Sequence, residues 1–366
     1  MVARGWRGLD QIPSDPGYEY IWLRARDGFR ILEVKPYLYM DQSLLASIGA
    51  LLPTDSRGIF LSIASHAIWA VCGFANFTIF LHHGFSLVHS YISGLLLVAT
   101  PWAAQSAIGN YGNVRWPILV AAAIVISSEI AHKRPRVWPM TLASVAATVS
   151  NPLHPLLIAL FVFGVLSLAR EERKSLLIPA TPLLLGLIIN LLNAETGGHS
   201  SKTTSLWDGA GLFWISGQLL PISISVVGIA FATWRLREAR PQRVFALCLL
   251  TMVLLIVFAS YQLGGIADRY FVAPSALAFI GVLVLLENLR LRHKVTIQIF
   301  RSILALVLMV PTVRWFFVFS YLRSSPGWST QIAVARQQCL DGSITSLQLL
   351  TSDGQTMTDP ISCNEL

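Results

Sequence analysis

Charged residues are scarce in this chain of 366 amino acids. They account for 13% of it, whereas hydrophobic residues account for 54%, and the mean hydropathy is +0.61. In soluble globular domains, roughly a quarter of the residues are charged. The shortage of charge therefore excludes an ordinary soluble domain and predicts a multi-pass membrane protein.

Cysteine is also rare, and no Cys-x-x-Cys or Cys/His spacing typical of zinc sites occurs. We therefore predict no metal site. Cys72 and Cys248 lie in apolar runs and are most simply small buried residues. Cys339 and Cys363 lie in a polar C-terminal tail, where an oxidising outer compartment would permit a disulfide between them.

About ten continuous apolar runs follow one another along the chain, each near the roughly 17 to 25 residues that a helix needs to cross a bilayer. Because the runs are continuous and do not alternate with polar residues, they predict helices and not a β-barrel. The Val137–Val149 run is short, so the number carries an uncertainty of one. The runs are Gly58–Leu81, Leu87–Gln105, Trp116–Ala131, Val137–Val149, Leu153–Ala169, Leu176–Leu192, Gln218–Trp234, Val244–Tyr261, Tyr270–Leu286 and Val295–Val318.

The formal net charge is +8, but the basic residues form no stripe with interleaved aromatics, which excludes nucleic acid as a partner. They gather instead in four alternate connections between the apolar runs. The positive-inside rule predicts that these four connections are cytoplasmic. Their basic residues are Lys133, Arg134 and Arg136; Arg170, Arg173 and Lys174; Arg235, Arg237, Arg240 and Arg243; and Arg290, Arg292 and Lys294.

This orientation divides the chain into three parts. Residues 1–56 are expected to form an extracytoplasmic loop with an interfacial helix, residues 57–322 a transmembrane all-α bundle, and residues 323–366 a short extracytoplasmic tail.

One observation disagrees with this orientation, because seven basic residues between Arg4 and Arg57 would favour the cytoplasm, and no signal peptide precedes them. Either one helix is miscounted or the natural chain begins upstream of Met1. We favour the second, since four separate basic connections support the orientation.

The connections on the other side are richer in glycine, proline and polar residues. Irregular backbone next to a membrane persists only where it packs on protein or lines a wet cavity. We therefore expect these segments to converge on one outward-facing cavity. They are Arg24–Pro53, Gly109–Asn113, Asn151–Pro155, Ala194–Trp214 and Tyr261–Pro274.

Three charged residues of these segments are candidates for chemistry, although each has a simpler explanation. Asp27 precedes a glycine and is typical of a turn, whereas Asp41 precedes an apolar stretch and is typical of a helix start. Arg269, at the head of a span, is typical of an interface anchor. Considered as a set, these residues suit a catalytic site, because a carboxylate in an apolar surround is a plausible general base and an arginine matches a phosphate.

Amide and aromatic side chains accompany them. Asn110 and Asn113 can cap the helix that follows, and Trp116 can belong to an interfacial aromatic belt. Beside an acid and an arginine, however, the same side chains suit a ligand that carries an anionic group and hydroxyls.

Four segments, in order along the chain from about Asp27, resemble a poorly characterised bacterial branch of the GT-C class of glycosyltransferases. The stretch "KPYLYMDQSLLASIGALLP" is similar to its early tyrosine-rich outer segment, and "PWAAQSAIGNYGNVRWP" to its "GNxxNxxW" entry into a span. "RYFVAP" is similar to its late "RYFxxP". The tail, with Trp328, Ala335, Cys339 and Cys363, is similar to its closing pattern of tryptophan, alanine and two cysteines.

The resemblance implies an inverting transferase of the bacterial plasma membrane. Such an enzyme moves a sugar from a polyprenyl-phosphate donor to a glycan or lipid acceptor of the cell envelope, on the extracytoplasmic face. It implies Asp27 or Asp41 as the base and Arg269 as the partner of the leaving phosphate, whose developing charge a fixed guanidinium stabilises. The residues that it implies in substrate binding are Tyr37, Gln105, Asn110, Asn113, Trp116 and Tyr270.

The chain departs from the pattern in two charges and one helix. Ser43 stands where the branch has an arginine, Gln105 stands where it has a glutamate, and the helix that normally precedes the acidic loop is missing. These departures keep a second interpretation open, that of an inactive accessory subunit. A third is a transporter or flippase of lipid-linked glycans, although the spans contain few ionisable residues and no inverted repeat.

Overall fold

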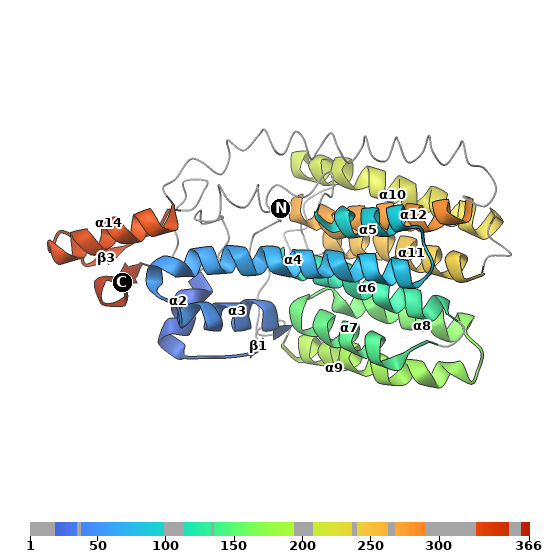
Figure 1. Ribbon diagram of the computed structural model, residues 1–366, viewed down its shortest axis with the longest axis horizontal. Helices are drawn as coiled ribbons and strands as arrows, with labels where there is room; N and C mark the ends of the chain where they lie inside the picture. The colour runs from blue at the N-terminus through green and yellow to red at the C-terminus, as the bar shows by residue number, and fades with distance from the viewer. Residues whose placement is uncertain are drawn as a thin grey trace.

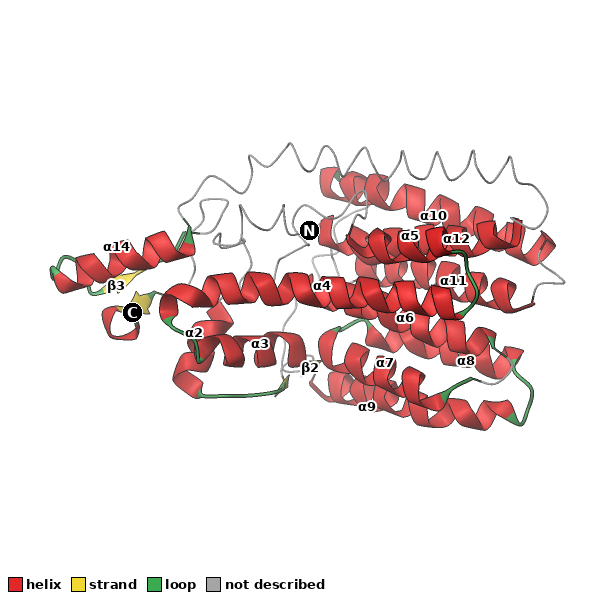
Figure 2. Cartoon of the chain, viewed as in Figure 1, coloured by secondary structure: helices red, strands yellow, loops and turns green. Residues whose placement is uncertain are grey.

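The structure is a computed structural model, and helices make up most of the residues that it describes (Figure 2). The described residues are 19–34, 38–98, 113–132, 135–193, 208–235, 240–262, 268–289, 327–350 and 360–366.

Among the described residues, nine helices lie side by side and form the body of the molecule (Figure 1). Within it, α11 packs between α10 and α12, and α6 packs against α4, α7 and α11. Residues 271–281, at the start of α12, are all buried, so this helix lies in the interior of the body. The nine helices are α4 (Arg57–His82), α5 (Leu87–Val98), α6 (Arg115–Ala131), α7 (Val137–Ser150), α8 (Ile158–Ser167), α9 (Leu177–Asn193), α10 (Gly209–Arg235), α11 (Arg240–Gln262) and α12 (Val272–Leu289).

In the described part of the chain, four segments are long and apolar enough to cross a membrane, namely Thr54–His82, Glu172–Asn193, Trp214–Trp234 and Pro241–Gln262. They indicate a membrane protein and agree with an all-α bundle. The expected number of about ten spans is matched only in part, because the other apolar helices described here are shorter. The expected run Val295–Val318 lies outside the described residues.

Proline explains one of the short helices. Pro152 and Pro155 follow α7, and a proline offers no N–H to a helix and clashes with the preceding turn. The chain therefore passes through a 3-10 turn, η4 (His154–Leu157), before α8 begins at Ile158. The expected run Leu153–Ala169 thus becomes a turn followed by a helix of 10 residues.

Successive helices run in opposite directions, so α4, α6, α8 and α10 all end at one end of the body (Figure 1). We call it the basic end, because residues of its connections are basic. The opposite end, where α6, α8, α10 and α12 begin, is called the cap end. The alternation is the one that the charge pattern predicts, whereas the side of the membrane that each end faces stays a prediction. The basic residues described at the basic end are Arg136, Arg170, Arg173, Lys174 and Arg243.

The segment before α4 folds into two helices and a small hairpin at the cap end. Helix α2 (Glu19–Asp27) packs on α3 (Met40–Ala50), and α3 also contacts α4 and α7. Between them, β1 (Glu33–Val34) pairs antiparallel with β2 (Leu38–Tyr39). The expected loop with one interfacial helix is therefore a more structured unit.

The tail comes back to this segment across most of the sequence. Helix α14 (Trp328–Leu340) lies at the cap end beside the start of α4 (Figure 1). The indole Nε1 of Trp328 donates to the carbonyl of Thr54 at 2.8 Å, and Gly58 makes room for the indole, since a Cβ there would lie 2.7 Å from its Cγ. A small core joins both segments to α4. It consists of Ile21, Ala46, Leu61, Trp328, Ile332, Leu349 and Ile361.

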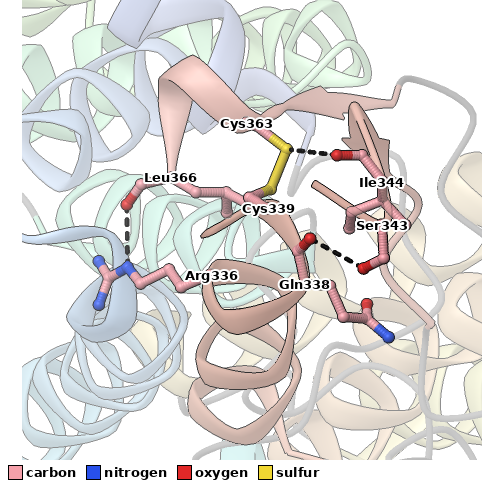
Figure 3. Close-up of a disulfide and its surroundings, with 7 residues drawn as sticks. All are labelled: Arg336, Gln338, Cys339, Ser343, Ile344, Cys363 and Leu366. Carbon is pink, nitrogen blue, oxygen red and sulfur yellow. Dashed lines mark hydrogen bonds between the residues drawn. A yellow bond between two sulfur atoms is a disulfide. The ribbon is translucent and has the colours of Figure 1, made fainter. Parts of the chain in front are cut away.

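The predicted disulfide between Cys339 and Cys363 is present (Figure 3). It links the end of α14 to η9 (Cys363–Glu365), next to the pairing of β3 (Ser346–Leu347) with β4 (Ile361–Ser362). Cys363 Sγ lies 3.4 Å from the Ile344 carbonyl, a contact without a hydrogen because the sulfur is bonded to its partner. Arg336 Nε donates to Leu366 O at 3.0 Å, so the tail closes on its own helix. Strand β3 lies within the polar tail that follows α14.

Candidate functional site

Four of the nine residues predicted for catalysis or binding cannot be located in detail. Tyr37, Gln105 and Asn110 lie outside the described residues. The backbone of Arg269 belongs to η7 (Asp268–Phe271), which leads into α12, but its side chain lies outside the description. Its predicted role at a phosphate therefore stays a prediction.

The structure separates the two candidate acids. Asp27 is exposed at the last position of α2, and Gly28 follows it with φ +86° and donates its N–H to the Arg24 carbonyl at 3.0 Å. This is the geometry of a helix end that closes on a glycine. Asp41, by contrast, is 5% exposed in the first turn of α3, where its Oδ1 accepts from the Gln42 N–H at 2.9 Å.

Asp41 also lies on the helix that contacts the body of the molecule. Helix α3 and strand β2 both contact α7, and α7 ends at the cap end of the body. The carboxylate is therefore buried next to the helices, whereas Asp27 faces outward from the unit in front of them. Of the two acids, Asp41 is the buried one, and burial is the environment that tunes a carboxylate toward a general base.

Ser43, one of the departures from the family pattern, has a structural role. It is fully buried, and its Oγ donates to the Arg30 carbonyl at 2.9 Å. Ser47, one turn later on the same face of α3, donates to the same carbonyl at 2.9 Å and accepts the Arg30 N–H at 2.9 Å. The two serines thus hold the segment after α2 against α3, and an arginine at position 43 has no room there.

Asn151 ties the head of α6 to the end of α7. Its Nδ2 donates to the Arg115 carbonyl at 3.0 Å, and its Oδ1 accepts the Leu153 N–H at 2.8 Å. Its carbonyl accepts from the His154 N–H and lies 2.9 Å from His154 Nδ1. Asn151 was not among the predicted site residues. An asparagine directly before a proline, at the end of an apolar run, is the signal that marks such a cap.

Asn113 and Arg115 open α6. Asn113 is 1% exposed in the turn before the helix. Arg115 is half-buried, with its Cζ 5.7 Å from the centre of the Trp116 ring, a cation–π contact. Its Nε is buried and has no hydrogen-bond partner among the described residues. Arg115 therefore places a guanidinium at the cap end.

Two aromatic pairs from four elements lie at the cap end, and Gln218 links them. The rings of Trp116 and Tyr270 lie 5.4 Å apart edge to face, and Gln218 Nε2 donates to the Tyr270 carbonyl at 3.3 Å. On α10, Trp214 lies one turn before Gln218, and its ring lies 5.2 Å from that of Tyr261 at the end of α11. We call these five residues the aromatic cluster. The predicted binding residues Trp116 and Tyr270 do come together in it.

The polar residues of the basic end serve mainly to join connections. Arg136 Nε and Nη2 both donate to Glu129 Oε1, at 3.0 and 2.6 Å, and the Glu129 carboxylate raises the pKa of Arg136. His83 Nδ1 lies 2.9 Å from His132 Nε2. Burial, together with the His132 imidazole, lowers the pKa of His83 to about 4. These contacts link the connection after α4 to the one after α6.

The cap end holds a buried carboxylate, a guanidinium and the aromatic cluster. Asp41 approaches from the α3 and α7 side, and the aromatic cluster lies on the α6, α10 and α11 side. The head of α6, fixed by Asn151, lies between the two. Among the described residues, no group of three or more His, Cys, Asp or Glu side chains could hold a metal ion.

Comparison with known proteins adds no relative, because no protein-family model, no curated protein and no solved structure matches the chain.

Proposed function

We propose that the protein is a membrane glycosyltransferase, which moves a sugar from a polyprenyl-phosphate donor to a glycan or lipid acceptor of the bacterial cell envelope. The observation that carries the proposal is a buried carboxylate, Asp41, at the same end of a helical membrane protein as a guanidinium and the aromatic cluster. The order of the family-like motifs along the sequence supports it as well.

In the proposed reaction, Asp41 takes the proton from the acceptor hydroxyl. The acceptor oxygen then attacks the anomeric carbon, a new glycosidic bond forms, and the bond from that carbon to the phosphate oxygen breaks with inversion. Negative charge grows on the leaving phosphate, and a fixed guanidinium lowers the barrier by stabilising it. The family resemblance gives this role to Arg269, and Arg115 is the described guanidinium that could share it.

The same proposal gives the protein an orientation. The disulfide in the tail forms in an oxidising compartment, so the cap end faces outward, and the basic end faces the cytoplasm. The lipid part of the donor then has an apolar surface to lie against, since α9 exposes Leu185, Ile188 and Leu191. This places the reaction at the outer leaflet of the plasma membrane.

A matched pair of acid variants tests the proposal. In membranes that contain the protein and a labelled polyprenyl-phosphoryl sugar, Asp41→Asn should lower the transfer rate by about 100-fold or more, the usual contribution of a general base. Asp27→Asn, the same change in an exposed residue, should stay within about threefold of the wild type. Immunoblots of the membranes control for expression.

Two results would count against this assignment. Full activity of Asp41→Asn would exclude Asp41 as the base, and full activity of both variants would exclude both acids. Wild-type protein that transfers sugar from none of the supplied donors would contradict the transferase itself.

A further inference from the structure

Five buried polar atoms without hydrogen bonds lie in or next to the aromatic cluster. Within the described part of the chain, Trp116 Nε1, Trp214 Nε1 and Gln218 Oε1 have no partner, although the three residues are 1%, 6% and 0% exposed. The hydroxyls of Ser260 and Ser275, both 0% exposed, lack one as well. An unsatisfied buried polar group is destabilising, so natural proteins seldom keep one without a use.

These atoms come from elements that are in contact at the cap end. Trp214 and Gln218 share one face of α10, and Gln218 bonds the carbonyl of Tyr270, whose ring touches Trp116. Ser260 directly precedes Tyr261, the ring partner of Trp214.

The closeness of α10 to η7 depends on a missing side chain. A Cβ at Gly217 would lie 2.2 Å from the Phe271 ring, and Ser275 follows Phe271 by one helical turn. The glycine therefore lets η7 and the start of α12 approach α10, and this brings Ser275 toward the cluster.

We propose that these atoms bind the hydroxyl groups of a hexopyranose, the sugar of the lipid-linked donor. The inference rests on the proposed function and names a subsite for it. The set is mixed, because the indole N–H groups donate, Gln218 Oε1 accepts, and the serine hydroxyls can do either. Sugar hydroxyls both donate and accept, so they match this set.

Other ligand classes match the set less well. A phosphate accepts only, and Gln218 Oε1 would face it with a lone pair. An apolar ligand would leave all five atoms without a bond. The aromatic rings complete the fit, since the C–H faces of a pyranose are flat and apolar and can lie on a ring face. Ordered water is the competing occupant, because one buried water makes about three hydrogen bonds.

Three probes separate the sugar from the lipid phosphate. These are farnesyl-phosphoryl-mannose, farnesyl-phosphoryl-glucose and farnesyl phosphate, each titrated by calorimetry into the purified full-length protein in lipid nanodiscs. We expect the wild type to bind at least one of the two glycosylated probes ten times or more as tightly as farnesyl phosphate. Trp116→Phe and Trp214→Phe, which each remove one unbonded N–H, should abolish most of that difference and leave the affinity for farnesyl phosphate within twofold.

Trp69→Phe is the matched control. Trp69 is 0% exposed in α4, and its Nε1 also lacks a partner among the described residues, but it does not belong to the cluster. The control variant should keep the full sugar-dependent difference. Ser275→Ala, which removes only a hydroxyl, covers the case in which a tryptophan variant does not fold.

The outcomes distinguish the subsite from the function. If the wild type binds farnesyl phosphate but gains nothing from either sugar, the cluster holds water only and the subsite is wrong, while the transferase proposal survives. The subsite is also wrong if the cluster variants keep the difference. If none of the three probes binds, both proposals fail together.

Discussion

At the scale of single residues, Ser43 shows how a departure from a motif can be structural. The family pattern expects an arginine at this position, but the hydroxyl of Ser43 bonds the Arg30 carbonyl inside the unit formed by α2 and α3. The loss of that charge therefore need not reflect a loss of activity.

This gives a prediction about stability. Ser43→Ala should lower the free energy of unfolding by about 0.5 to 1 kcal/mol, at the low end for a hydrogen bond, because Ser47 still donates to the same carbonyl. Ser43→Arg should cost several times more, since it buries an unpaired charge. Thermal unfolding in detergent measures both, with the exposed Ser56→Ala as control. A Ser43→Arg variant as stable as the wild type would show that the site has room for the longer side chain.

Single residues were the hardest level to predict from sequence. The sequence alone does not say which of Asp27 and Asp41 is the better candidate for the base. Only their burial and the neighbouring elements distinguish them. Trp214 and Gln218 were missed because nothing in an apolar run marks which of its polar atoms will lack a partner. Trp116 and Tyr270 were predicted from the family-like motifs, and their rings are in contact, while their role in binding stays a prediction.

At the scale of elements, the hydrophobic pattern was informative. The apolar run Gly58–Leu81 became α4 with an error of one residue at each end, and the direction of each helix followed from the basic connections. Helix lengths were predicted less well, because the prolines after α7 delay the start of α8, whereas α10 continues through Pro221. The start of α14 lies in a segment of mixed composition, where the pattern gave no helix.

Contacts between elements of the basic end predict a dependence on pH. The pKa of His83 is about 4 in the folded protein, below the value of about 6.5 for a free histidine. A lowered pKa means that the folded state favours the neutral ring. Its stabilising contribution is therefore complete above about pH 6.5 and is lost as the pH falls toward 4.

We therefore expect the midpoint of thermal unfolding to fall between pH 7 and pH 4.5, and to fall less in His83→Gln than in the wild type. His82→Gln changes the exposed neighbour and should behave like the wild type. An equal fall in all three proteins would mean that protonation of His83 does not limit stability in this range.

At the scale of the whole molecule, sequence could not predict that α14 of the tail packs beside the start of α4. Trp328 reaches Thr54 across most of the chain, and Gly58 gives it room, but no local pattern connects these residues. Such contacts depend on where the two segments leave the membrane domain. The disulfide was predictable, since the only two cysteines of the polar tail had no other partner of their kind.

The orientation of the whole molecule can be tested through the same disulfide. If the cap end faces outward, a membrane-impermeant maleimide should not label intact bacterial cells that express the protein, because Cys339 and Cys363 are paired and Cys72 and Cys248 are buried. After treatment with a reductant, the same reagent should label two thiols per chain in intact cells. A Cys339→Ser/Cys363→Ser variant, which should remain unlabelled, shows that the signal comes from the tail.

If the reduced thiols are labelled only in broken cells, the orientation is the reverse of the proposed one. The cap end and Asp41 would then face the cytoplasm, and a reaction on the outer leaflet would be excluded, although a reaction at the inner leaflet would still use the same residues. The four basic connections argue against this result, because each of them would then lie on the side that the positive-inside rule disfavours. The labelling pattern therefore tests the charge pattern, the disulfide and the proposed location of the chemistry in one experiment.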